Sequence, residues 1–287
     1  MRQQKAAQVT TNQPNRDIQY EGAGAANVNQ NSSGAALTFD DVTMIFHSKG
    51  SERLKALDRV SFNVAPNEFV SIIGPSGCGK STLLRLAAGL AKPAFGMVRM
   101  GDHAVTAPEK SVGMVFQQPL LLPWRSVIDN VLLPAEILRL KERGMRAEAL
   151  RLLELAGLEK FKDGRTYNLS GGMQQRVAIC RALIHDPSIL LMDEPFGALD
   201  AITREDMSYT LLKIWQQRRK TVLFVTHSIS EAVMLSDRII ILSQRPGTVR
   251  EIIKVNLARP RAWEMEQTTD FQKLVLHLKG MLQSHGK

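Results

Sequence analysis

Hydrophobic positions along the chain follow two patterns, and each predicts a different kind of strand. In the first, apolar residues alternate with polar ones on both sides of a polar loop, at Leu37, Phe39, Val42, Met44, Val60, Phe62 and Val64. A period of two predicts half-buried antiparallel strands. In the second, runs of strand length are almost continuously apolar: Phe69–Ile73, Ile189–Met192 and Val222–Thr226. Such runs are typical of parallel strands that helices cover on both faces.

Apolar residues at helical spacing lie between these strands. They predict helices over Ser81–Ala91, Arg146–Ala156 and Met173–His185. Ser170 and two glycines open the third helix, and Gly157 can cap the second. Alternating strands and helices predict an α/β fold with a mainly parallel sheet, joined to the antiparallel strands near the N-terminus. Residues 119–168 contain no strand-like run, and we expect them to form a helical insertion.

The two ends of the chain differ from the middle. Residues 1–36 are polar, rich in Gln, Asn and Ala, and without periodic hydrophobicity, which predicts a disordered tail with no secretory signal. We expect the folded domain to span residues 37–261. A helical patch at Phe271–Leu282 predicts a C-terminal helical extension over residues 262–287.

Composition excludes several classes of protein. The 287 residues are 44% hydrophobic and 23% charged, as in globular proteins. No apolar stretch approaches the ~20 residues of a membrane helix, and two cysteines are too few for a disulfide framework. We therefore expect a soluble cytosolic protein rather than a transmembrane, disulfide-rich or fibrous one. The formal charge of +9 suits nucleic acid, a phosphorylated ligand or an anionic membrane surface, without choosing between them.

A glycine-rich segment follows the first buried run and precedes a predicted helix. It matches the phosphate-loop pattern G-x-x-x-x-G-K-[ST] with Gly74, Pro75, Ser76, Gly77, Cys78, Gly79, Lys80, Ser81 and Thr82. Backbone N–H groups and the helix N-terminus would hold phosphate there. Lys80 would reach the β- and γ-phosphates, and the Ser81 hydroxyl would bind Mg²⁺. The alternative is a glycine-rich turn, but the flanking strand and helix favour the phosphate loop.

The other two buried runs end at ionisable residues. Asp193 and Glu194 follow one run, and His227 follows the other. Ligands of open α/β sheets gather at the carboxyl ends of the strands, so these residues should meet the phosphate loop. Asp193 suits a Mg²⁺ contact, Glu194 a base for attacking water, and His227 a sensor of the γ-phosphate. Taken alone, His227 would more often be a structural histidine at a strand end.

A second glycine-containing motif, Leu169–Arg176 with the sequence LSGGMQQR, identifies a family. It occurs in one order with the phosphate loop, Gln117, Asp193-Glu194-Pro195, Phe196–Asp200 and His227. This ordered set resembles the ATP-binding-cassette ATPases over roughly residues 37–261. The resemblance implies a P-loop NTPase core that binds ATP and Mg²⁺.

The resemblance also implies roles for individual residues. In that family two copies enclose ATP, so the phosphate loop of one copy would face Ser170, Gly171, Gly172 and Gln174 of the other. Asp200 would communicate across the dimer, and Gln117 would join the Mg²⁺ and water site to the helical insertion. The catalytic set would be Glu194, His227, Lys80 and Gln117, and the metal set Ser81, Gln117 and Asp193. Phe46 would stack on adenine, unless it is a core residue, and Ser170 could instead be an ordinary helix cap.

Two further segments are similar to importers of the nitrate, sulfonate and taurine type. They are Gln118–Val131, which is rich in Pro, Trp and apolar residues, and Asp237–Gly247 with Leu257–Arg261. The resemblance implies a homodimeric energy-coupling ATPase on the cytoplasmic face of the cell membrane. A separate permease and a solute-binding protein would complete the importer, and Gln118–Val131 would receive a permease helix unless it is only locally packed.

The rival interpretation is a cytosolic cassette ATPase that serves an assembly or nucleic-acid process. One cassette instead of a tandem pair, and the lack of an Arg-rich segment with interleaved aromatics, favour the importer and no nucleic-acid partner.

Two expectations concern reactivity and charge. Cys78 stands near Lys80 at a helix N-terminus, a setting that lowers a thiol pKa and would make Cys78 reactive, unless it is a shielded filler. Arg245, Arg250, Arg259 and Arg261 are expected on a solvated or membrane-facing surface.

Overall fold

The structure is a computed structural model that describes residues 34–47, 53–140 and 142–283. Most of the tail predicted to be disordered, residues 1–33, lies outside the described residues, as do the last four of the predicted C-terminal extension. Residues 34–36 have no regular secondary structure and lead directly into the first strand.

A four-stranded antiparallel sheet contains the alternating pattern. It has the order β2-β1-β4-β5, and its strands are β1 (Leu37–His47), β2 (Arg53–Val64), β4 (Phe95–Met100) and β5 (His103–Ala104). The period-two prediction is confirmed, because β1 pairs antiparallel with β2 and Phe39 stacks on Phe62 with ring centroids 4.4 Å apart. The pattern did not predict β4 and β5, whose exposed Phe95 and Met97 break the alternation.

The second sheet has six strands in the order β10-β9-β3-β8-β7-β6. They are β3 (Phe69–Ile73), β6 (Val112–Val115), β7 (Ile189–Asp193), β8 (Thr221–Val225), β9 (Arg238–Leu242) and β10 (Val249–Lys254). All neighbours are parallel except β10, which pairs antiparallel with β9. The mainly parallel sheet is therefore confirmed, and the three predicted strands β3, β8 and β7 are adjacent at its centre.

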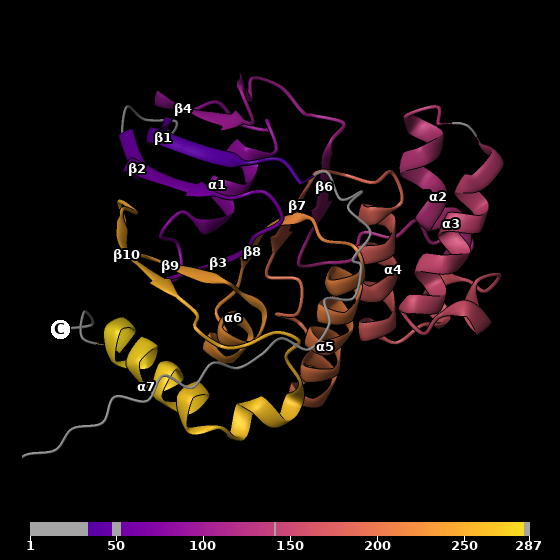
Figure 1. Ribbon diagram of the computed structural model, residues 1–287. Coiled ribbons are helices and arrows are strands. Elements are labelled where there is room, and N and C mark those ends of the chain that lie inside the picture. Colours follow the sequence, from indigo (N-terminus) through magenta and orange to yellow (C-terminus); the bar gives the residue numbers. More distant parts are fainter. Residues whose placement is uncertain (1–33, 48–52, 141, 284–287) are drawn as a thin grey trace, which may run out of the picture. The chain divides into compact units, whose positions relative to one another are not determined.

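The two faces of this sheet pack into different cores. Leu223 and Val225 of β8 face the first sheet and α1 (Lys80–Ala87), which lies between the sheets in Figure 1. Val222 and Phe224, the alternate residues, pack on the opposite face with α4 (Gly171–Leu183) and α5 (Ala201–Gln217). Burial on both faces is why the run is continuously apolar instead of alternating.

The predicted helices occur with shifted bounds. Helix α1 ends at Ala87, not at residue 91, because Gly89 adopts φ 69° and closes the helix. The amides of Gly89 and Leu90 donate to the carbonyls of Leu86 and Arg85, which is a Schellman cap. A Cβ on Gly89 would lie 2.1 Å from the Ala107 carbonyl oxygen, so glycine is required there.

The segment between β6 and α4 is helical, as expected. Among its described residues it consists of α2 (Val127–Ile137), α3 (Glu142–Leu155) and the 3₁₀ turns η1 (Glu159–Phe161) and η2 (Thr166–Asn168). Ser126 caps α2 by accepting a hydrogen bond from the Asp129 amide. Val131 and Leu152 share a buried core with Val177 of α4 and with the sheet. The insertion is thus attached to the helix that carries the LSGGMQQR motif.

A C-terminal segment packs against the part of the second sheet that contains β3 and β9. Helix α6 (Ile229–Leu235) packs against α7 (Thr269–Gln283), which buries Phe271, Val275 and Leu278, and the 3₁₀ turn η3 (Trp263–Gln267) leads into α7. The predicted helical patch falls within α7. In the part of the chain that the structure describes, no helix is both long and apolar enough to span a bilayer.

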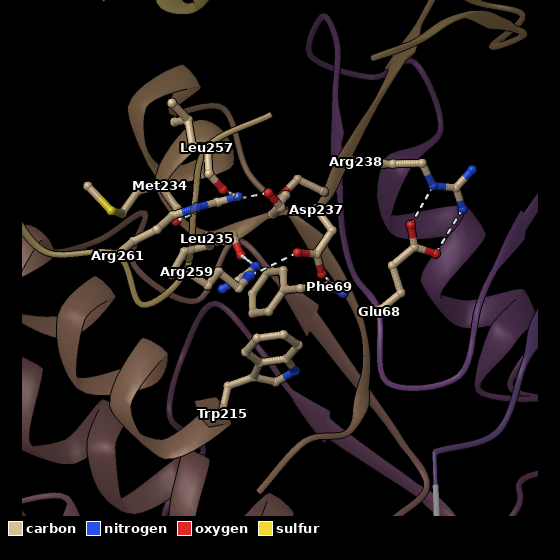
Figure 2. A network of polar contacts seen from close by, with 12 residues as sticks. Glu68, Phe69, Trp215, Met234, Leu235, Asp237, Arg238, Leu257, Arg259 and Arg261 are labelled. Atoms are coloured by element: carbon tan, nitrogen blue, oxygen red, sulfur yellow. Dashed lines mark hydrogen bonds and ion pairs between the residues drawn. The ribbon is translucent and has the colours of Figure 1, made fainter. Parts of the chain in front are cut away.

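The expectation of a surface position for the C-terminal arginines was wrong for two of them. Arg261 is 5% exposed and donates hydrogen bonds to the carbonyl oxygens of Val233, Met234, Ser236 and Leu257. The end of α6 leaves carbonyls without helical partners, and the guanidinium satisfies them (Figure 2). Burial lowers the pKa of Arg261 to about 10.

Arg259 forms a second internal link in the same place. Its Nε lies 2.8 Å from Asp237 Oδ1, and its guanidinium stacks 4.3 Å from the centroid of Trp215. The other carboxylate oxygen of Asp237 accepts the Phe69 amide at 2.9 Å, so this network ties the C-terminal segment to the first residue of β3 (Figure 2). A charge-rich sequence segment can therefore be buried when its donors have buried acceptors.

Candidate active site

The phosphate-loop segment joins β3 to α1. Gly79 stands at the N-terminus of α1 with φ 104°, and a Cβ there would lie 2.5 Å from Leu57 Cδ2. No side chain caps this end of the helix. The first-turn amides of α1 lack helical acceptors, so the segment has the donors that an anion requires.

Lys80 lies over the loop that precedes it. Its Nζ donates to the carbonyl oxygens of Gly74 and Pro75, at 3.0 Å each, and the residue is 7% exposed. Two neutral carbonyls are weaker partners for an ammonium than a phosphate oxygen. The side chain is thus held directly beside the loop, with partners that a phosphate oxygen could replace.

Ser81 and Asp193 bring the loop and the end of β7 together. The Ser81 hydroxyl donates to Asp193 Oδ1 at 2.9 Å. Burial raises the pKa of Asp193, and the charge of Glu194 adds to the effect, whereas the Ser81 hydrogen bond opposes it. A cation bound at this pair would favour the ionised carboxylate and reverse the effect of burial.

Glu194, His227 and Gln117 converge around Gly197. The Glu194 Oε2 lies 3.5 Å from His227 Nδ1, and both side chains are partly exposed, by 27% and 53% respectively. A Cβ on Gly197 would lie 3.3 Å from Gln117 Nε2 and 3.5 Å from His227 Cε1. Three of the predicted residues, from the ends of β6, β7 and β8, therefore meet at one edge of the sheet.

Glu194 has a backbone conformation that is unusual for a residue other than glycine. Its φ is 43°, and its amide donates to the Val225 carbonyl oxygen at 2.9 Å. A left-handed conformation is uncommon for a non-glycine residue and is more frequent at functional sites. It turns the chain directly after β7 while the backbone stays bonded to β8.

A cavity of about 310 Å³ opens beside the phosphate loop. It is lined by Phe46, Leu54, Ala56, Ser76, Gly77, Gly79, Lys80, Ser81, Thr82, Glu194 and Arg245. Phe46 is 39% exposed and pairs with Leu54 across β1 and β2, so it is not a core residue. An exposed aromatic ring at the end of a phosphate-binding cavity is suited to stacking on a base.

The LSGGMQQR motif forms the start of α4. Ser170 caps the helix and accepts the Met173 amide at 3.3 Å, with Gly171 as the first helical residue. The Gln174 amide group donates to the carbonyl oxygens of Thr166 and Leu169. Among the described residues, none of this motif lines the cavity at the phosphate loop.

Asp200 lies close to that motif. A Cβ on Gly172 would lie 2.6 Å from Thr203 Cγ2, so the first turns of α4 and α5 pack closely. Asp200 caps α5, and hydrogen bonds from the backbone and side chain of Thr203 lower its pKa. The start of α4 and Asp200 thus form one surface away from the cavity.

The expectation of a lowered pKa for Cys78 was wrong. The residue is 1% exposed, and burial raises its pKa by more than the nearby Lys80 charge lowers it. The Gly247 backbone covers it so closely that a Cβ on Gly247 would lie 2.1 Å from the Cys78 carbonyl oxygen. The Cys78 thiol is therefore buried and shielded, in agreement with the alternative interpretation of the sequence.

Sequence reasoning missed two contacts at the site. Arg245 Nε donates to the Gly77 carbonyl oxygen at 3.1 Å, although the two residues are 168 positions apart. Gln175 is buried and donates to the Phe116 carbonyl oxygen at 3.0 Å, which connects α4 to the segment that carries Gln117. Arg245 lies in a polar turn with no pattern to mark it. Gln175 could have been noticed as a polar residue on an otherwise apolar helix face.

Comparisons with known proteins agree with this geometry. The family model described as "ABC transporter" matches residues 57–197. An uncharacterized ABC transporter ATP-binding protein of Methanocaldococcus jannaschii is 48% identical, over 84% of this chain and 90% of the relative. The aliphatic sulfonates import ATP-binding protein SsuB of Bacillus cereus is 42% identical, over 84% of this chain and 94% of the relative. The taurine import ATP-binding protein TauB of Rhizobium johnstonii is 48% identical, over 74% of this chain and 81% of the relative.

Solved structures extend the similarity to three dimensions. The ATP-binding cassette MJ0796, in a dimeric post-hydrolysis state bound to ADP and Pi, aligns with a TM-score of 0.67 and 37% identity. The alignment covers 77% of this chain and all of that cassette. The extent of these matches shows that the chain belongs to the ABC transporter family and is one of its ATP-hydrolysing cassettes.

Proposed function

We propose that this cassette couples ATP hydrolysis to the import of a small solute of the sulfonate, taurine or nitrate type. The observation that carries the proposal is the meeting of Lys80, Ser81, Asp193, Glu194 and His227 at the carboxyl ends of three adjacent strands. The relatives that are named as import ATP-binding proteins support the direction of transport.

Mg²⁺ fits the side chains at the head of α1. The hydroxyl of Ser81 and the carboxylate of Asp193 are hard oxygen ligands of the kind that Mg²⁺ prefers, and Gln117 adds an amide oxygen. Among the described residues there is no cluster of three or more His, Cys, Asp or Glu suited to a metal, which agrees with an ion held mainly by phosphate and water. Bound with ATP, Mg²⁺ would neutralise phosphate charge.

Residues of the chain itself bind the nucleotide and activate the attacking water. Lys80 and the loop amides bind and orient the phosphates, and Phe46 stacks on the adenine. The Glu194 carboxylate accepts a proton from the attacking water or orients that water toward phosphorus. The His227 Nδ1 lies 3.5 Å from Glu194 Oε2, which supports a role for His227 in holding the Glu194 side chain and contacting the γ-phosphate.

A second copy would complete the site. Ser170, Gly171, Gly172 and Gln174 stand apart from the cavity of their own copy, at a helix N-terminus whose amides suit a phosphate. The relative MJ0796 has been solved as a dimer. In the proposed homodimer this motif closes over the ATP of the partner, and Asp200 lies at the junction.

The segment after Gln117 is proposed to contact the permease. Arg181 anchors its backbone by donating to the carbonyl oxygens of Pro119 and Leu120, while the Leu120 and Trp124 side chains remain exposed. Exposed apolar side chains on a fixed backbone suit docking of a partner helix. The end of the segment, from Val127, is instead packed into the core, as the local-packing alternative expected.

The transported solute is proposed to be an aliphatic sulfonate or taurine, with nitrate-like anions as the next class. The two importer-named relatives support this choice. A separate solute-binding protein would deliver the solute to the permease, and the complex would lie at the cytoplasmic face of the cell membrane.

Reconstitution tests the proposal. The cassette is purified together with the products of its neighbouring genes and placed in liposomes, and ATP hydrolysis is measured in the presence of each candidate solute. We expect stimulation by one sulfonate-class solute and none by DNA or RNA. Stimulation by nucleic acid but not by permease and solute would contradict the proposal and support the rival interpretation.

A further inference from the structure

Two loops of the active site are joined by a charged pair behind them. Glu231, in the first turn of α6, is almost buried, with 8% of its side chain exposed. Its Oε1 lies 3.6 Å from Nε of Arg204 in α5. Neither side chain lines the cavity at the phosphate loop, and neither is among the residues proposed above to bind ATP.

On the histidine side, the Glu231 carboxylate organises the backbone around His227. The Thr226 hydroxyl donates to Glu231 Oε2 at 2.6 Å and accepts the Ser228 amide at 3.0 Å. The Ser228 hydroxyl in turn accepts the Glu231 amide at 3.3 Å. The residues directly before and after His227 are therefore both fixed by one buried carboxylate.

On the other side, Arg204 holds the backbone next to Asp200. Its Nη2 donates to the Leu199 carbonyl oxygen at 2.8 Å. Its Nε is buried without a hydrogen bond, because 3.6 Å to Glu231 exceeds hydrogen-bond distance. A polar cavity of about 180 Å³, lined in part by Arg204, Glu205, Ser208 and Glu231, gives the pair room to move.

We propose that Arg204 and Glu231 are positioning residues that make the Asp200 loop and the His227 loop move together. The inference rests on the proposed function, in which Asp200 meets the partner copy and His227 meets the γ-phosphate. Closure of the dimer on Asp200 shifts the Leu199 backbone, Arg204 follows it, and Glu231 passes the shift to Thr226 and Ser228. ATP hydrolysis thereby depends on the partner being in place.

The alternative is that the pair only stabilises the fold. Removal of one member of a buried pair leaves the other charge unpaired and destabilises a protein in any case. Loss of stability alone therefore cannot distinguish the two. A change in turnover with unchanged ATP affinity can, because a pair that only stabilises the fold does not act on kcat in the folded enzyme.

The test compares Glu231→Gln, Arg204→Met and the double variant with Glu205→Gln, a carboxylate that lines the same cavity and lies outside the pair. For each, kcat, KM, the Kd of a fluorescent ATP analogue and the melting temperature are measured. We expect each single variant to lose about tenfold or more in kcat, since small misplacements of reacting groups cost up to about 10²-fold. Kd should stay within about twofold, and the double variant should lose no more kcat than the singles.

Arg204→Met keeps the test decisive if Glu231→Gln fails to fold, because the Arg204 side chain is partly exposed. A kcat equal to that of Glu205→Gln, or losses that multiply in the double variant, would overturn the inference. If the wild type and Glu205→Gln fail to hydrolyse ATP at all, the proposed function fails and the inference with it.

Discussion

Lys80 illustrates how the fold holds a single charged side chain against the phosphate loop. Its ammonium is bonded to two carbonyl oxygens of the loop that it would leave on binding phosphate. Burial raises the pKa of Asp193, and a cation bound beside it would lower that pKa again. Individual side chains of the site thus have partners within the protein that a bound phosphate or cation would replace.

Glu194→Gln is expected to separate binding from turnover. The amide keeps the size of the side chain but cannot accept a proton from water, so turnover should fall by about 10²-fold or more. The Kd of ATP should change little, since Lys80 and the loop amides are untouched. Steady-state ATP hydrolysis and analogue binding measure the two quantities. Near-normal turnover would remove Glu194 from the role of base.

Native protein is expected to resist thiol alkylation. Cys78 and Cys180 are both buried, and burial raises both pKa values, that of Cys180 to about 12. The reactive thiolate is therefore scarce at pH 8. Mass spectrometry after iodoacetamide treatment should find both thiols unmodified until denaturant is added. Rapid labelling of Cys78 in the folded protein would show that the loop opens more than the structure indicates.

At the scale of elements, the phosphate loop, the three central strands and the helical insertion follow from sequence patterns because their signals are local. The apolar runs of β3, β7 and β8 and the spacing of glycines in the loop are each contained in a few residues. Strands β4 and β5 lack such a run, and β9 contains one that was not assigned to a strand from the sequence.

Contacts between distant segments could not be predicted in this way. Arg245 reaches Gly77, and Arg261 reaches the end of α6, only because the fold brings them there. Both arginines stand in polar, proline-containing sequence that is typical of a solvated surface. Their acceptors are backbone carbonyls, which have no sequence signature.

Arg261→Met tests the internal role of that arginine. The substitution leaves the carbonyl oxygens of Val233, Met234 and Ser236 without donors, and a buried unsatisfied group costs about 1–3 kcal/mol. We expect the free energy of unfolding to fall by about 3 kcal/mol or more. Arg250→Met is the control, since Arg250 is exposed and donates to the Met281 carbonyl oxygen, and it should cost less than about 1 kcal/mol. Urea titrations give both values, and equal losses would contradict the assignment.

For the molecule as a whole, the residues proposed to bind ATP lie on two different surfaces of one chain. The cavity at the phosphate loop includes Phe46 and Glu194, whereas Ser170 and Asp200 lie on the surface formed by the first turns of α4 and α5. In the proposed homodimer a second copy completes the site, and two-fold symmetry then gives two equivalent ATP sites. Gln175 of α4 donates to the Phe116 carbonyl oxygen, which links α4 to the segment that carries Gln117 and continues into the proposed permease contact.

Complementation between two inactive variants tests this division most directly. Lys80→Ala disables the loop but keeps the LSGGMQQR motif, and Ser170→Arg disables the motif but keeps the loop. A mixed dimer contains one site in which both halves are intact. We expect each variant alone to be inactive and an equimolar mixture to regain ATP hydrolysis. No activity in a mixture shown by sedimentation to contain ATP-bound dimers would contradict it.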